Sequence, residues 1–290
     1  MRNVTLAFTQ KACTGDQAAD LDHAEAMVRQ AAAAGAQVIL LQELFAGLYF
    51  CQEENPSHFD LAETVTDAPV VKRFSNLAKE LGVVLPISFF ERAGRSFFNS
   101  VVVADADGSV SATYRKSHIP DGPGYEEKYY FTPGDSGFLV TKTAFGTLGV
   151  GICWDQWFPE AARTMALLGA EILCYPTAIG SEPQDPSLDS SAHWRRVMQG
   201  HAAANMMPVV ASNRVGKETF GSSSITFYGT SFIAGGTGEI MAEASRAEET
   251  FGCVTVDLDA LELARRSFGL FRDRRPDLYQ PLLTYDGVQN

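Results

Sequence analysis

Apolar residues recur along the chain with two spacings, one typical of helices and one typical of strands. In residues 18–34, Leu21, Ala24, Val28 and Ala31 lie on one helical face, and a glycine ends the stretch. Short continuous apolar runs between such stretches have the length of buried strands. The pattern predicts helices at 18–34, 70–81, 158–168, 191–205 and 258–267, and strands at 4–9, 37–41, 83–90, 98–104, 111–115, 145–152, 171–175, 209–213, 225–227, 231–234 and 253–257.

The order of these elements repeats weakly within the chain. Gly35-Ala36 and Gly169-Ala170 each end a helix and precede a buried strand, and each strand is followed by a helix, another strand and a hairpin. The strands 225–227 and 231–234 are expected to pair as a hairpin. Two halves that each carry helices on one face of a sheet can pack sheet against sheet. We therefore expect one domain over residues 1–290, an α/β fold with a four-layer α-β-β-α sandwich, and a tail from about 271 without clear periodicity.

Composition and charge narrow the class of protein. The chain carries a net charge of -12, which argues against a nucleic-acid partner and is mildly attractive to cationic small molecules. No apolar stretch approaches the ~20 residues of a membrane-spanning helix. The five cysteines are widely spaced and form neither a disulfide framework nor a zinc motif. We expect a soluble protein of the reducing cytoplasm.

Three ionisable residues follow the ends of apolar strands. Cys153 follows the apolar run 148–152 and precedes a helix that begins near Pro159, so we expect an exposed elbow where helix N–H groups favour the thiolate. Glu43 follows the strand 37–41, and Lys116 follows the strand 111–115. Sites in α/β proteins are built at such strand ends. A structural core cysteine is the alternative for Cys153, but a nucleophile with a nearby acid and ammonium fits all three positions.

The segments around these residues resemble the nitrilase, or carbon–nitrogen hydrolase, superfamily. The resemblance rests on three motifs in the family's order: Leu40-Leu41-Gln42-Glu43-Leu44-Phe45, Tyr114-Arg115-Lys116-Ser117-His118-Ile119-Pro120 and Val150-Gly151-Ile152-Cys153-Trp154-Asp155. Further segments at 120–131, 176–183, 193–201 and 274–279 look most like the branch of N-carbamoylputrescine amidohydrolases. The resemblance spans nearly the whole chain.

The resemblance implies a role for each matched residue. Cys153 is the nucleophile, Glu43 takes its proton, and Lys116 faces the developing oxyanion beside the backbone N–H of Trp154. Glu127 matches the family's second glutamate, which helps to hold the lysine. The implied reaction releases ammonia, forms a carbamoyl-thioester and ends in carbon dioxide and putrescine, with no metal or organic cofactor. His118 invites a papain-like Cys–His pair, which is disfavoured because Glu43 and Lys116 already fill the required roles.

The expected substrate is a cationic carbamoyl amine whose distal ammonium calls for a carboxylate. Glu182 is the first candidate, and Tyr49 is a candidate for lining the pocket. The resemblance also implies a homo-oligomer, with subunit contacts near Trp194 and through the C-terminal tail. Two alternatives stay open: another hydrolase of this fold (for a carbamoyl amino acid, an aliphatic amide or a nitrile), and a binding or scaffold protein that does not catalyse.

Overall fold

The first half of the chain, together with the late strand β14, builds a sheet covered by two helices. The structure, a computed structural model, describes residues 1–288. Strand β1 pairs antiparallel with β14 and parallel with β2, and a bridge between Val38 and Val84 joins β2 to the antiparallel set β3-β4-β5. The bounds are β1 Asn3–Gln10, β2 Val38–Leu40, β3 Leu85–Ala93, β4 Ser96–Ala104, β5 Tyr114–Arg115 and β14 Thr250–Asp257.

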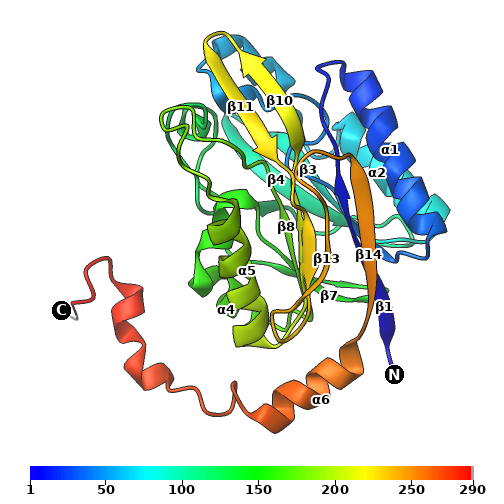
Figure 1. Cartoon of the computed structure of the whole chain (residues 1–290), viewed down its shortest axis with the longest axis vertical. Helices are drawn as coiled ribbons and strands as arrows, with labels where there is room; N and C mark the ends of the chain where they lie inside the picture. Colours follow the sequence, from blue (N-terminus) through cyan, green and yellow to red (C-terminus); the bar gives the residue numbers. More distant parts are fainter. Residues whose placement is uncertain (289–290) are drawn as a thin grey trace.

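The second half builds a six-stranded sheet in the order β13-β12-β9-β8-β7-β6. Its centre is parallel, because β7, β8 and β9 follow one another through crossover helices. The bounds are β6 Val140–Thr143, β7 Gly146–Val150, β8 Ile172–Pro176, β9 Val209–Ser212, β12 Phe232–Ala234 and β13 Ile240–Glu243. A separate hairpin of β10 Val215–Phe220 and β11 Ser223–Tyr228 projects beyond the sheets (Figure 1).

Helices cover the outer face of each sheet, which confirms the four-layer α-β-β-α fold. Helices α1 (Gln17–Ala33) and α2 (Pro69–Leu81) pack on the first sheet, and α4 (Pro159–Leu167) and α5 (Ser191–Asn205) pack on the second. The period of two along β1 explains the layering: Leu6 and Phe8 enter the core between the sheets, whereas Ala7 faces the helices.

Several predicted elements need correction. The segments 225–227 and 231–234 do not pair with each other, because β11 pairs with β10, and β12 lies between β9 and β13. The strands β6, β10 and β13 were not predicted, since their residues are only partly buried and their apolar pattern is weak. A turn at Gly235-Gly236 connects β12 to β13.

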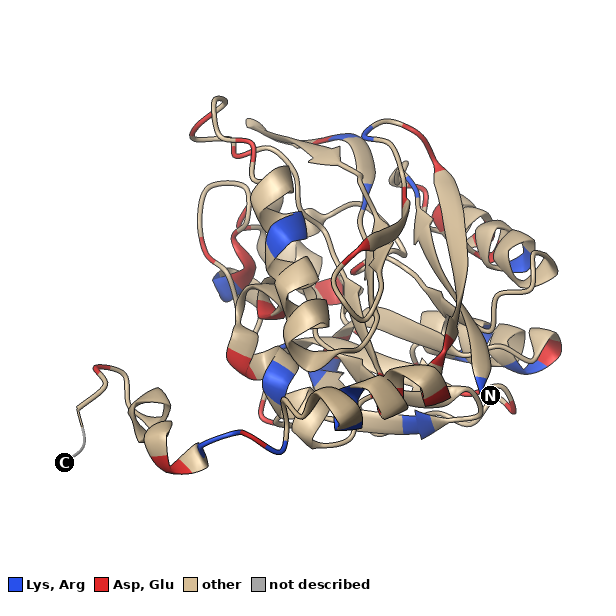
Figure 2. Cartoon of the chain, turned by 60° about the horizontal axis from the view of Figure 1, so that its bottom comes forward, with Lys and Arg blue, Asp and Glu red and all other residues tan. Residues whose placement is uncertain are grey.

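The C-terminal segment that follows β14 extends away from the two sheets (Figure 1). Helix α6 (Leu258–Phe268) is followed by short 3₁₀ turns at Pro276–Leu278 and Gln280–Leu283, and this segment extends away from the sandwich (Figure 1). Basic and acidic positions are interspersed along the chain in the view of Figure 2. Within residues 1–288, no helix has the length and apolar character needed to cross a membrane.

Candidate active site

Cys153 lies directly after the strand β7, at the start of a short 3₁₀ turn, Cys153–Trp157, that precedes α4. Its φ of 41° lies in the left-handed region, which costs a non-glycine residue free energy and marks an imposed geometry. The expected exposure is wrong, because the side chain is only 5% exposed. Burial together with the charge of Glu43 raises the pKa of the thiol, although Lys116 lowers it, so the shift is opposite to the one expected from the helix end. The sulfur lies 3.8 Å from the Ala178 carbonyl oxygen.

Asp155 fixes the turn that carries the cysteine. One carboxylate oxygen accepts hydrogen bonds from the Ile152 backbone N–H at 2.9 Å and the Tyr114 hydroxyl at 2.6 Å. The other oxygen lies 3.0 Å from the His118 backbone nitrogen and 2.7 Å from its Nδ1. Asp155 therefore links the segment after Lys116 to Ile152, the residue before Cys153. The His118 ring stacks on that of Phe158, with 3.7 Å between the ring centroids.

Lys116 lies between two carboxylates in the interior. Its Nζ donates to Glu43 Oε1 at 2.8 Å and to Glu127 Oε2 at 2.6 Å, and all three side chains are fully buried. Burial opposes the lysine charge, but the charges of Glu127 and Glu43 outweigh it and raise the pKa of Lys116. Burial raises the pKa of Glu127 to about 7, while the Lys116 ammonium opposes that rise. Glu127 begins the short helix α3 (Glu127–Tyr130), which brings it to the lysine.

Only one of the two carboxylate oxygens of Glu43 is hydrogen-bonded within the described residues. Its Oε1 accepts from Lys116 and from Asn99 Nδ2 at 2.7 Å, whereas its buried Oε2 has no hydrogen-bond partner among the described residues. A buried, unpaired carboxylate oxygen is costly unless it has a task. The charge of Glu43 acts on Cys153, and an acceptor in that position is suited to take the thiol proton.

Tyr49 is buried beside the charged cluster, whereas Glu182 lies closer to the surface. Tyr49 is fully buried, and its hydroxyl donates to Glu127 Oε1 at 2.7 Å, so this side chain orients the glutamate. Glu182 is half-buried in the loop after β8 (Ile172–Pro176). Burial and the charge of Glu182 raise the pKa of Tyr125, and the charge of Cys153 acts on the same phenol. Tyr125 is therefore close enough to both Glu182 and Cys153 for their charges to act on its hydroxyl. Trp154, which follows Cys153 in the sequence, is 38% exposed.

Sequence reasoning missed four residues of this site. Asn99 holds Glu43, Tyr125 joins the loop of Glu182 through the Gly180 N–H at 3.0 Å, and Arg214 and Glu218 form a buried ion pair at 2.9 Å behind Glu43. A signal existed for two of them: Asn99 interrupts an apolar strand, and Arg214 directly follows one. Such polar residues in buried runs are candidates for functional contacts.

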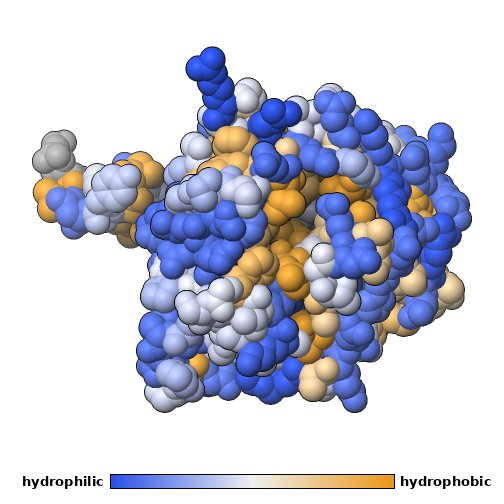
Figure 3. Space-filling view, turned by 90° about the horizontal axis from the view of Figure 1, so that it is seen from above, coloured by the Kyte–Doolittle hydropathy of each residue, from blue (hydrophilic) through white to orange (hydrophobic). Residues whose placement is uncertain are grey.

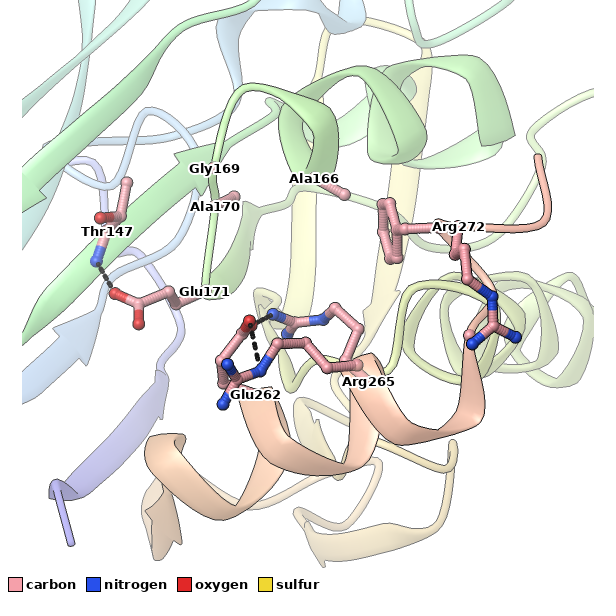
Figure 4. Close-up of a pocket in the computed structure, with 11 residues that line it drawn as sticks. Thr147, Ala166, Gly169, Ala170, Glu171, Glu262, Arg265 and Arg272 are labelled. Carbon is pink, nitrogen blue, oxygen red and sulfur yellow. Dashed lines mark hydrogen bonds and ion pairs between the residues drawn. The ribbon is translucent and has the colours of Figure 1, made fainter. Parts of the chain in front are cut away.

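Two large cavities lie outside this cluster. One of about 600 Å³ lies between the end of α4 and α6, where Glu262 pairs with Arg265 (Figure 4). Another of about 360 Å³ is mainly apolar and is bounded by α1, residues 44–50 and Phe220. Apolar side chains also gather in a hollow on the face seen from above (Figure 3). Neither cavity is lined by Glu43, Lys116, Glu127 or Cys153. Within residues 1–288, no group of three or more His, Cys, Asp or Glu side chains is arranged so that it could hold a metal ion.

Comparison with known proteins places this arrangement in a family. The model of the carbon–nitrogen hydrolase family matches residues 5–266. The chain belongs to the carbon–nitrogen hydrolases. This confirms the resemblance recognised in the three motifs, and the chain is therefore a member of an enzyme family that hydrolyses carbon–nitrogen bonds.

Relatives and solved structures agree with the assignment to this family. The chain is 59% identical to an N-carbamoylputrescine amidase of Arabidopsis thaliana over 99% of its own length and 97% of the relative. It is 53% identical to a citrullinase of Francisella tularensis over 98% and 99% of the two chains. A carbon–nitrogen hydrolase structure from Helicobacter pylori superposes with a TM-score of 0.92 at 43% identity, covering 98% and 99% of the two chains.

Proposed function

We propose that this enzyme hydrolyses N-carbamoylputrescine to putrescine, carbon dioxide and ammonia, a reaction of polyamine biosynthesis. The observation that carries the proposal is the buried Glu43–Lys116–Glu127 cluster beside Cys153, in a chain 59% identical to an N-carbamoylputrescine amidase over nearly its full length. No step requires a metal or organic cofactor, because a thiol, a base and an ammonium suffice for acyl transfer.

The first half of the reaction forms a thioester. Glu43 Oε2 takes the proton of the Cys153 thiol as the sulfur attacks the ureido carbonyl carbon. The oxyanion faces the Lys116 ammonium and the Trp154 backbone N–H, and the loss of one such donor typically costs about 3 kcal/mol of barrier. The proton on Glu43 passes to the departing nitrogen, which leaves as ammonia, and a carbamoyl-thioester remains on Cys153.

The second half regenerates the enzyme. Glu43, ionised again, takes a proton from water, and the hydroxide adds to the thioester carbonyl. The carbon–sulfur bond breaks, Cys153 regains a proton, and the released carbamate decomposes to carbon dioxide and the free amine. Glu127 stays bonded to Lys116 throughout, and Tyr49 holds Glu127 in that orientation.

Substrate choice depends on the far end of the ligand. Putrescine ends in an ammonium, which suits the half-buried carboxylate of Glu182. Citrulline carries the same ureido group but ends in an α-amino acid, whose carboxylate would meet Glu182 with like charge. The 53% identity to a citrullinase makes it the second candidate substrate.

A comparison of the two substrates tests the proposal. Ammonia release is measured with N-carbamoylputrescine and with citrulline, for the wild type and for Glu182→Gln. We expect the higher kcat/KM with N-carbamoylputrescine, and Glu182→Gln should lower it for that substrate alone. A higher kcat/KM with citrulline would refute the substrate assignment. Ammonia release undiminished in Cys153→Ala would instead refute the mechanism, and a wild type that is inactive on all ureido compounds, amides and nitriles would favour the scaffold alternative.

We further infer a homo-oligomer of single-domain subunits working in the cytoplasm. The tail after α6 exposes large apolar side chains, among them Leu282, Leu283 and Tyr285, which favours their burial against another subunit. The proposed domain and tail extend to residue 290, of which 289 and 290 lie outside the described residues. A reducing compartment suits a reaction that needs a free thiol. A monomer in light scattering would refute the assembly.

A further inference from the structure

A buried arginine holds the turn that follows the proposed base. Arg214 comes just after β9 and is fully buried. Its Nη2 donates to the main-chain carbonyls of Glu43 at 3.0 Å and Leu44 at 2.7 Å, and its Nη1 donates to that of Gly47 at 2.8 Å. One guanidinium thus satisfies three carbonyl groups within five residues of chain, which a lysine with a single nitrogen cannot do in the same geometry.

Glu218 completes the arrangement from the hairpin. One of its oxygens accepts from Arg214 Nη1 at 2.9 Å, and the other accepts from the Tyr49 backbone N–H at 2.6 Å. The Arg214–Glu218 pair therefore bonds to both ends of the segment 43–49. One end carries Glu43, and the other carries Tyr49, whose hydroxyl bonds to Glu127. Both carboxylates that contact Lys116 are thereby connected to one ion pair.

The segment needs such a restraint. Leu44 has a φ of 49°, in the left-handed region that a leucine rarely adopts, and this strain persists only where surrounding contacts impose it. A buried ion pair is a poor means of gaining stability, because desolvation offsets much of the attraction between the charges. A pair that makes four hydrogen bonds to the main chain of one short segment is better explained by the need for a defined position.

We propose that Arg214 and Glu218 are positioning residues that set where Glu43 and Glu127 stand around Lys116. The inference rests on the proposed role of Glu43 as base. Neither residue contacts the reacting atoms. They act through the main chain of 43–49, so their loss should lower the rate of the chemical step more than the affinity for substrate.

The test uses Arg214→Lys, Arg214→Ala and Glu218→Gln in the full chain, with Arg29→Ala as the matched control. Arg29 also pairs with glutamates, but on the exposed surface of α1. We expect kcat to fall about 100-fold in the Arg214 variants, as a displacement of roughly 1 Å at a reacting group can cause, and about 10-fold in Glu218→Gln, with KM changed less than kcat. Guanidinium chloride at non-denaturing concentration should restore part of the kcat of Arg214→Ala, whereas sodium chloride should not.

Two readouts separate positioning from folding and from the proposed function. The unfolding transition shows whether a variant is folded. If the Arg214 variants unfold, Glu218→Gln tests the inference in their place, because glutamine keeps the shape of the glutamate side chain. The rate of Cys153 alkylation by iodoacetamide needs no substrate, and we expect it to be slower in the variants because the base is displaced. An unchanged kcat in a folded Arg214→Lys or Glu218→Gln overturns the inference, as does kcat loss that only follows unfolding. A wild type inactive on ureido substrates refutes the proposed function alone, since the alkylation rates still test positioning.

Discussion

Replacing Gly134 by alanine should displace Lys116, the proposed oxyanion donor, without contacting its side chain. The Gly134 N–H donates to the Lys116 carbonyl oxygen at 2.8 Å, so these two segments run against each other. A Cβ at position 134 would lie 2.1 Å from the Arg115 carbonyl oxygen and 2.8 Å from that of Lys116. Real Cβ atoms essentially never come closer than 3.0 Å to another heavy atom, and the obstruction is backbone, which cannot rotate away.

The size of the effect follows from this overlap. The segment at Arg115–Lys116 has to move by roughly 1 Å, and overpacking of this kind typically costs about 1–3 kcal/mol of stability. A displacement of about 1 Å at a catalytic group can lower the rate about 100-fold. We therefore expect Gly134→Ala to remain folded at 25 °C with a lower Tm, and to lose about two orders of magnitude in kcat/KM.

The assay is ammonia release together with thermal unfolding, and Gly122→Ala is the matched control. A Cβ at Gly122 meets no atom within 4 Å, and its φ lies outside the left-handed region, so this variant should behave like the wild type. Wild-type activity and Tm in Gly134→Ala would show that the backbone around Lys116 adapts freely, which would refute the reasoning from close packing.

Three further changes test other parts of the structure. Burial raises the pKa of Glu127 to about 7, so protonation of this carboxylate as the pH falls through 7 should weaken its bond to Lys116. We therefore expect kcat/KM to fall on the acid side with a midpoint near pH 7, and this fall should be absent in Glu127→Gln. An unchanged pH profile in that variant would contradict the reasoning. Asp155→Asn replaces an oxygen that faces two donors by an amide N–H₂, so we expect chemical denaturation to show a loss of about 3 kcal/mol or more, together with reduced activity. Gly200→Ala lies on the exposed face of α5 with nothing near its Cβ and should raise the free energy of unfolding by about 0.5–1 kcal/mol, whereas a decrease would indicate that this face is covered.

The fold could be predicted where the apolar pattern is strong. The helix expected at 191–205 has the same bounds in the structure, and the four layers follow from alternating strands and helices. The hairpin of β10 and β11 could not be predicted in the same way. Its residues are partly buried without a regular alternation, and it packs on the loops of the site rather than in a sheet core, so its pairing depends on tertiary contacts.

The site, like the fold, could be predicted only in part: the residues at strand ends could be identified from the sequence, but their contacts and pKa shifts in the interior could not. Glu43, Lys116 and Cys153 could be singled out because each follows an apolar strand. The direction of the pKa shift of Cys153 could not be predicted, because the helix-end argument ignores burial, which raises the pKa of the thiol. The hydrogen bond between Tyr49 and Glu127 joins residues 78 positions apart in the sequence, and no local sequence pattern predicts it.

The raised pKa of the thiol is compatible with catalysis once the buried charges are considered together. Two carboxylates and one ammonium share this interior, so a thiolate formed by losing its proton to solvent would add a second uncompensated negative charge, which burial disfavours strongly. Transfer of the proton from the sulfur to the free oxygen of Glu43 leaves the net charge unchanged. The thiolate then gains the attraction of Lys116, and the neutral Glu43 no longer repels it. In the proposed mechanism, proton transfer and nucleophilic attack are therefore coupled through Glu43, so a raised pKa of the buried thiol is compatible with its proposed role as nucleophile.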